Sequence, residues 1–118
     1  MERRDLDDRV LVFGARVLRL VEALPRAVAG RHVGTQLLRS ATSIGANYEE
    51  AQAAESHADF VHKLQVALKE ARETNYWLRL IEAARLLPAA TLAALLDEST
   101  QLKAILAKSV ARAKGTAK

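Results

Sequence analysis

Residues Phe60 to Ile81 read FVHKLQVALKEARETNYWLRLI, and the spacing of their side chains decides the fold. Residues of one helical face recur at alternating intervals of four and three over three heptads: Phe60, Leu64, Ala67, Ala71, Thr74, Leu78 and Ile81. This alternation is typical of a helix that packs along its length against other helices. The stretch therefore predicts a long helix that begins at Ser56 and ends near Leu86.

The start of this helix carries a capping signal. Ser56 is followed three residues later by Asp59, which resembles a capping box with Asp in place of the usual Glu. Three further segments have the same periodicity and predict helices over Asp7–Leu24, Val33–Ala54 and Ala89–Ala113. Their stripes are, in turn, Val10, Phe13, Val17, Leu20 and Leu24; Leu37, Ala41, Ile44, Tyr48 and Ala51; and Leu92, Leu95, Ser99, Leu102, Leu106, Ser109 and Ala113. Pro25 is expected to end the first of them, because proline is disfavoured after a helical residue.

Composition supports helices almost throughout. The chain has 118 residues, half of them hydrophobic, with two prolines and five glycines. Four amphipathic helices with short connections favour an all-α, antiparallel up-down-up-down four-helix bundle, and heptad spacing predicts left-handed crossing. We expect one domain over residues 1–118.

Several classes of protein are disfavoured by what the sequence lacks. There is no cysteine, which excludes disulfides and thiolate metal sites. The first residues are charged and do not resemble a secretory signal, and no apolar run approaches the ~20 residues that span a bilayer. The expectation is a cytoplasmic protein that is not embedded in a membrane.

A longer stretch carries a family resemblance. Gln36–Ile81 contains RSATSIGAN from Arg39 to Asn47 and ALKEARET from Ala67 to Thr74, followed by Tyr76-Trp77-Leu78. These motifs resemble the four-helix-bundle family of rRNA intervening-sequence proteins, and they include polar residues at fixed offsets. Tyr48 departs mildly from that pattern, since many members have an aliphatic residue there.

The resemblance implies a bundle without enzymatic activity that can associate as a pentameric ring. Some members of the family are encoded within insertions of ribosomal RNA genes. A similar bundle is the accessory protein of diversity-generating retroelements, which is basic, pentameric, and binds a reverse transcriptase and nucleic acid. The resemblance thus implies a homopentamer with RNA, DNA or a protein as partner.

Two helices carry polar side chains at helical spacing. The second predicted helix has a polar stripe of Ser40, Ser43, Asn47 and Glu50, and the third offers Glu70, Glu73 and Trp77. Buried polar groups are normally paired, so the favoured interpretation is a hydrogen-bonded set that fixes the register of the helices. A binding site on the bundle and a subunit interface remain as alternatives.

Metal and catalytic sites find little support in the sequence. Asp59 and His62 resemble half of a di-iron motif, but no second acid-x-x-His unit is present, and His57 lies five residues from His62. There is no cysteine nucleophile and no glycine-rich phosphate loop. We therefore expect no cofactor, no metal and no enzymatic activity.

Charge is distributed unevenly along the chain, whose formal net charge is +4. Residues 101–118 contain five basic residues and no acidic ones. In an up-down bundle this segment lies beside the start of the chain. The sequence therefore predicts a basic pole formed by Arg3, Arg4, Arg9, Lys103, Lys108, Arg112 and Lys114. Its cations either complement the helix dipole and aid solubility, or form a nucleic-acid-binding surface.

Two interpretations of the function follow. The first is a non-catalytic oligomeric bundle that binds RNA or DNA through the basic pole; because few aromatic residues accompany the cations, binding is expected to be backbone-directed and salt-sensitive. The second is a protein–protein adaptor or accessory subunit, for example of a reverse transcriptase, in which the charge is incidental. Oligomerisation is also expected from apolar residues outside the main stripes: Val61, Leu68, Leu80, Leu96 and Ile105.

Overall fold

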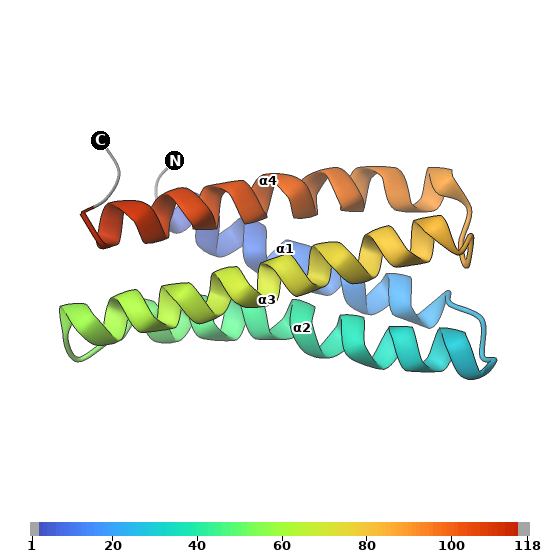
Figure 1. Cartoon of the computed structure of the whole chain (residues 1–118), viewed down its shortest axis with the longest axis horizontal. Helices are drawn as coiled ribbons and strands as arrows, with labels where there is room; N and C mark the ends of the chain where they lie inside the picture. The colour runs from blue at the N-terminus through green and yellow to red at the C-terminus, as the bar shows by residue number, and fades with distance from the viewer. Residues whose placement is uncertain (1–2, 116–118) are drawn as a thin grey trace.

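The computed structural model describes residues 3–115, and these form four α-helices joined by short turns. Their bounds are α1 Arg3–Glu22, α2 Val28–Gln52, α3 His57–Ala83 and α4 Ala89–Ala113. Successive helices run in opposite directions, so the arrangement is up-down-up-down (Figure 1). The predicted all-α four-helix bundle is confirmed, with extents of 44 × 24 × 21 Å.

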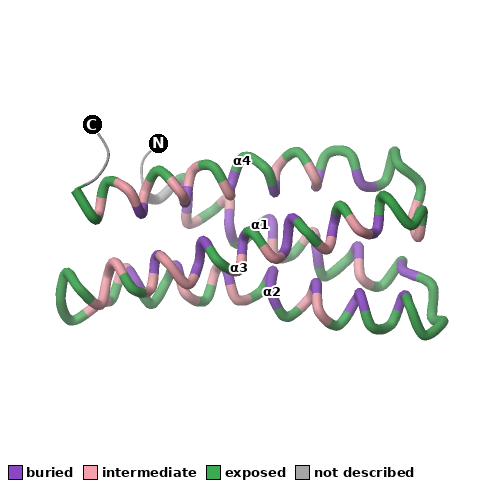
Figure 2. The backbone as a smooth tube through the Cα atoms, in the orientation of Figure 1, coloured by how far each residue is buried: buried purple, intermediate pink, exposed green. Residues whose placement is uncertain are grey.

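The predicted apolar stripes form the core. Every stripe residue of α1 and α2 is buried, and so are those of α3 from Leu64 onward. Buried residues lie on the inner side of each helix (Figure 2). In the last turns of α4 the stripe drifts, because Val110 is buried while Ser109 and Ala113 are only half-buried. A helix of 3.6 residues per turn rotates against a strict heptad, which accounts for this drift.

Both ends of α3 have defined caps. Ser56 is the N-cap: its Oγ accepts a hydrogen bond from the Asp59 backbone N–H at 3.0 Å, and an Asp59 carboxylate oxygen accepts from the Glu55 N–H. The predicted capping signal is thus confirmed. The C-terminal end comes earlier than expected, because Arg85 adopts a left-handed φ of 55° and the Leu86 N–H bonds back to the Ile81 carbonyl.

The start of α2 was predicted five residues too late, at Val33 instead of Val28. The helix begins with Ala27 as an N-cap that makes no side-chain hydrogen bond, so the sequence offers no capping signal there. Gly30 and Gly34 lie inside the helix and are buried, where they allow α2 to approach the α1–α2 turn closely.

This close approach makes Gly30 sensitive to substitution. A Cβ at Gly30 would overlap the backbone carbonyl of Pro25, which cannot move like a side chain. We expect Gly30→Ala to lower the free energy of unfolding by about 1–3 kcal/mol, measured by denaturant titration. Gly34→Ala is the matched control, since its Cβ would meet only side-chain ends of Val21 and Leu24 at 3.2 and 3.3 Å. Equal stability of the two variants would contradict this account of the turn.

None of the helices within residues 3–115 is both long enough and apolar enough to cross a membrane.

Candidate nucleic-acid interface

Four members of the predicted basic pole lie on the second half of α4 or, in the case of Lys114, at its C-cap. Lys108, Arg112 and Lys114 are exposed, and within residues 3–115 none of the three forms an ion pair. Lys103 is half-buried and its Nζ donates to the Asn75 Oδ1 at 3.3 Å. We call these four residues the α4 cations. The side chains of Arg3 and Arg4, also assigned to the basic pole, lie outside the described part of the structure.

Arg9 differs from the rest of the predicted pole. Its guanidinium makes a bidentate contact with Glu98 of α4, at 2.7 and 3.0 Å, and donates to the Gln101 Oε1 at 3.1 Å. The hydrogen bond with the Glu98 carboxylate raises the pKa of Arg9. Arg9 therefore joins α1 to α4, with its charge balanced by Glu98, and contributes little free positive charge to the surface.

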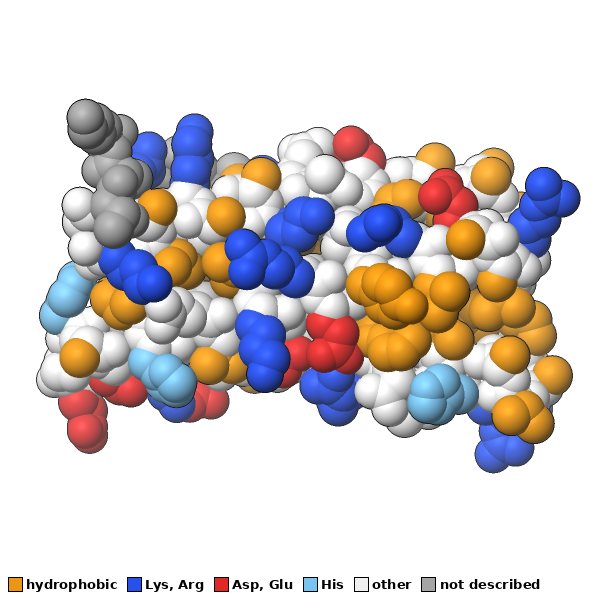
Figure 3. All heavy atoms as spheres, in the orientation of Figure 1, with side chains coloured by type: hydrophobic (Ala, Val, Ile, Leu, Met, Phe, Trp, Pro, Cys, Tyr) orange, Lys and Arg blue, Asp and Glu red, His pale blue; other side chains and the backbone are white. Residues whose placement is uncertain are grey.

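The face formed by α3 and α4 is rich in cations. Lys and Arg side chains gather over these two helices, while acidic side chains gather by the α2–α3 turn (Figure 3). Arg72 and Arg79 of α3 are exposed and, like the α4 cations, pair with no carboxylate within the described chain. The result is a surface of free positive charge that can attract phosphate groups.

A hollow lies between α3 and α4 beside two of these cations, Lys108 and Arg112. The two helices are close at their connecting turn and diverge toward the chain termini (Figure 1). Apolar side chains line the space, and Lys108 and Arg112 also contact it. Its volume is about 560 Å³. We call it the α3–α4 hollow; its apolar lining comes from all four helices: Leu6, Tyr48, Phe60, Leu64, Ile105 and Ala113.

The predicted polar stripe of α2 does not form a single site. Ser40 is fully buried, and its Oγ accepts a hydrogen bond from Thr74 of α3 at 2.9 Å. Asn47 is half-buried and donates to Ser43 of its own helix at 2.9 and 3.2 Å. Glu50 is exposed and pairs with the Lys63 Nζ at 2.9 Å. Only Ser40 has the geometry of a buried contact that sets the register of α2 against α3.

The predicted partners on α3 gather around one arginine. Arg39 of α2 forms ion pairs with Glu70 and Glu73, and the Trp77 Nε1 donates to a Glu73 carboxylate oxygen at 3.0 Å. The bond from Trp77, together with Arg39, lowers the pKa of Glu73. The ring of His32 meets Trp77 edge-on with centroids 6.2 Å apart. This cluster connects α2 to α3 at the surface. Its charged groups, Arg39, Glu70 and Glu73, are paired with one another and so are not available to bind a ligand.

One buried polar residue, Asn75, was not predicted from the sequence. Asn75 of α3 is 2% exposed; its Nδ2 donates to Ser99 and Thr100 of α4 at 3.2 and 3.3 Å. Its Oδ1 also accepts a hydrogen bond from Lys103, so Asn75 connects α3 to three polar side chains of α4: Ser99, Thr100 and Lys103. A signal was present, because Ser99 interrupts the apolar stripe of α4 and a buried serine needs a partner.

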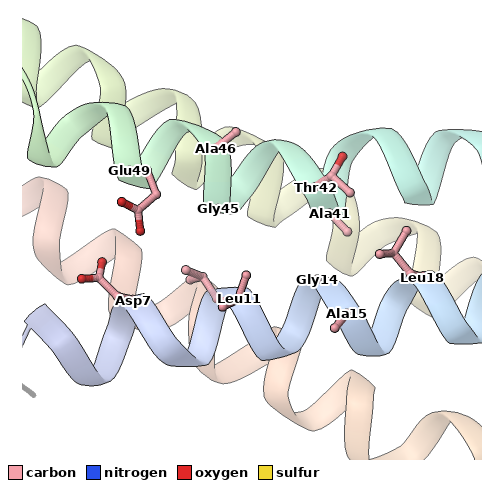
Figure 4. A pocket seen from close by; sticks show the side chains of 11 residues that line it. Asp7, Leu11, Gly14, Ala15, Leu18, Ala41, Thr42, Gly45, Ala46 and Glu49 are labelled. Atoms are coloured by element: carbon pink, nitrogen blue, oxygen red, sulfur yellow. The ribbon is translucent and has the colours of Figure 1, made fainter.

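A second concave surface lies between α1 and α2. It has a volume of about 370 Å³ and its floor is made of small residues, among them Gly14, Ala41 and Gly45. Leu11 and Leu18 flank it and are 73% and 46% exposed. Asp7 and Glu49 extend toward each other at one end (Figure 4). We call this surface the α1–α2 groove.

The histidines take part in ordinary contacts. The His57 Nε2 lies 2.8 Å from the Ala113 carbonyl oxygen, and its ring lies 6.2 Å from that of Phe60. His62 is exposed. In the described part of the chain, no three His, Asp or Glu residues come together in a way that could hold a metal ion.

The fold and its surfaces define a class of protein: a four-helix bundle with a cationic α3–α4 face and an apolar groove on α1–α2. The family model described as 23S rRNA-intervening sequence protein matches residues 8–108. The chain belongs to this family. The resemblance carried by Gln36–Ile81 is thereby confirmed and extends to helices α1 and α4.

A solved structure supports the same assignment. It is a protein of unknown function from the S23 ribosomal protein family of Bacteroides thetaiotaomicron, 37% identical to this chain. The match covers 89% of this chain and 97% of that one, with a TM-score of 0.82. No curated protein matches the sequence significantly.

Proposed function

We propose that this chain is a non-catalytic, cytoplasmic, self-associating bundle that binds RNA or DNA through the α4 cations. The observation that carries the proposal is the state of Lys108, Arg112 and Lys114: all three are exposed, close in sequence at the C-terminal end of α4, and without a carboxylate partner in the described chain. By contrast, Arg9, Arg39 and Lys63 are balanced by glutamates. Free charge at one end of the bundle is suited to phosphates, which supply most of the affinity in sequence-independent binding.

The direct test is a gel-shift titration with a labelled RNA and a labelled DNA duplex at ~50 mM salt, where phosphate contacts are strong. The proposal expects a retarded band with at least one of the two. If neither nucleic acid is retarded at protein concentrations of ~10 µM, the α4 cations do not form a nucleic-acid interface of ordinary non-specific affinity, and the proposal fails.

Self-association is supported by the α1–α2 groove. Of the apolar residues expected to form a contact surface, Leu68 is buried and Val61, Leu80, Leu96 and Ile105 are half-buried, whereas Leu11 and Leu18 are exposed. Exposed leucines beside a floor of glycine and alanine allow another surface to approach closely. We therefore place the contact at the groove, with a second copy of this chain as its occupant.

Charge complementarity favours a second copy as the occupant. The groove carries carboxylates at Asp7 and Glu49, and one oxygen of Asp7 is buried without a hydrogen-bond partner. The α3–α4 face carries free Arg72 and Arg79 around Tyr76, which is 51% exposed. Among the described residues no Cα atom of α1 lies within 8 Å of one of α3, and none of α2 within 8 Å of one of α4, so these two faces lie on opposite sides of the bundle. A contact in which the groove of one copy meets the α3–α4 face of the next copy is head-to-tail. Such contacts form a closed ring when the rotation from each copy to the next leads back to the first copy.

The groove gives a prediction for the oligomeric state. We expect Leu11→Gln with Leu18→Gln to convert the oligomer to a monomer in light scattering at micromolar concentration. Burial of each leucine in an interface contributes about 1.5–3 kcal/mol, which glutamine does not supply, although glutamine maintains the helix.

Val12→Gln is the matched control, because Val12 is 55% exposed and adjacent to Leu11 but does not line the groove. It should leave the mass unchanged. A wild-type chain that is monomeric at micromolar concentration would refute self-association.

The adaptor function is the second candidate, and the α1–α2 groove favours it as well. If the chain were monomeric, the same apolar, acid-rimmed surface would fit a basic amphipathic helix of a partner protein, such as a reverse transcriptase. Two results together distinguish this function from the first: a monomeric wild-type chain and the absence of nucleic-acid binding at low salt.

A further inference from the structure

The α3–α4 hollow combines an apolar lining with two free cations. Phe60 is half-buried there, and Tyr48 reaches the hollow from α2. In the sequence these aromatic residues are far from Lys108 and Arg112, but in the folded chain all four line one space. Apolar side chains show between Lys and Arg side chains on this part of the surface (Figure 3). Few aromatic residues accompany the cations in the sequence, but the folded chain brings Phe60 and Tyr48 to the same hollow as Lys108 and Arg112.

The chemistry of the lining restricts what can occupy the hollow. An apolar lining alone would accept any nonpolar group, but unpaired cations at Lys108 and Arg112 select an occupant that joins a nonpolar part to an anion. An unpaired nucleotide has this composition, with a flat base and flanking phosphates. Bases without a pairing partner stack on aromatic side chains, whereas a base inside a duplex is already stacked and paired.

We propose that the α3–α4 hollow receives one unpaired base of single-stranded RNA or DNA, with the flanking phosphates on Lys108 and Arg112. This inference rests on the proposed nucleic-acid binding and adds a preference for single strands. Gln52 is half-buried in the lining, and its amide can both donate to and accept from the edge of a base. Phe60 supplies the ring for stacking.

The test compares three labelled ligands of equal length by fluorescence anisotropy at ~50 mM salt, where phosphate contacts are strong. They are a single strand, the duplex of that strand, and an abasic strand with the same phosphates and no bases. We expect the single strand to bind roughly tenfold more tightly than the abasic strand, the contribution of about one stacked base. The duplex should also bind more weakly than the single strand.

The outcomes separate the inference from the proposed function. Equal affinity for the single strand and the abasic strand overturns the inference and leaves phosphate binding intact; the hollow would then accept another group, such as a side chain of a protein partner. Failure of all three ligands to bind overturns the proposed function and the inference together. Both results are obtained with the wild-type chain, so neither depends on a variant that folds.

A pair of variants locates the effect. We expect Phe60→Leu to weaken binding of the single strand roughly tenfold and leave binding of the abasic strand unchanged, because leucine retains apolar volume but removes the stacking ring. Val28→Ala is the control for a surface substitution, since Val28 is 86% exposed on α2, lies outside the hollow and belongs to neither proposed contact face. A Phe60→Leu chain with an undiminished preference for the single strand over the abasic strand would overturn the inference.

Discussion

Reversing the charges of Lys108 and Arg112 together is expected to weaken nucleic-acid binding by at least about 100-fold at ~50 mM salt, because two phosphate contacts become repulsive. Both side chains are exposed and without carboxylate partners, so their loss breaks no ion pair within the described chain. The variant Lys108→Glu/Arg112→Glu should bind RNA and DNA more weakly regardless of sequence. Its salt dependence should also be shallower, by roughly 0.7–0.9 in slope for each phosphate contact removed.

The control for this variant changes net charge equally at the opposite end of the bundle. Arg26 and Arg31 are exposed at the α1–α2 turn, and Arg31 lies near the start of α2, where glutamate favours the helix dipole. Arg26→Glu/Arg31→Glu should therefore retain most of the affinity. If both double variants lose binding equally, the effect comes from net charge, and the α4 cations are not the interface. Circular dichroism of both variants checks that the fold is retained.

Replacing Phe13 by alanine is expected to lower the free energy of unfolding by about 3–5 kcal/mol, a large share of the ~5–15 kcal/mol typical of a domain. Phe13 is 1% exposed, and among the described residues it is the largest fully buried side chain of the core. Its removal takes away the buried surface of the ring and leaves a cavity that rigid neighbouring helices fill only in part.

Val12→Ala provides the comparison for this variant. Val12 precedes Phe13 on the same helix and is 55% exposed, so its truncation should change stability by no more than about 0.5 kcal/mol. Urea unfolding of both variants measures the difference. A Phe13→Ala chain as stable as Val12→Ala would mean that α1 does not pack into the core through this face.

Periodicity predicted the helices and the core because a heptad stripe depends only on local spacing. Leu64, Leu78 and Ile81 could be assigned to the interior without knowing what they contact. The bounds of α4 were correct, since Pro88 precedes the helix and Gly115, which has a positive φ of 76°, follows it. The start of α2 was missed because close packing, not capping, determines how its first turn lies against Pro25.

The site was harder to predict because it depends on pairs that are distant in sequence. Arg9 and Glu98 are 89 positions apart, so nothing local indicated that the charge of Arg9 is balanced. Likewise, Phe60 lines the same hollow as Lys108 and Arg112 only in the folded chain, where α3 packs beside α4. Charge runs in the sequence located the α4 cations, but which cations stay free could be determined only from tertiary contacts.

The salt dependence of wild-type binding tests the central claim most directly. Fluorescence anisotropy with a labelled single-stranded RNA should give a dissociation constant that rises on the order of 50-fold between ~50 and ~200 mM salt, as expected if about four phosphates contact the α4 cations. A dissociation constant that stays constant over this range, or no binding at the lower salt, would contradict nucleic-acid binding by these residues.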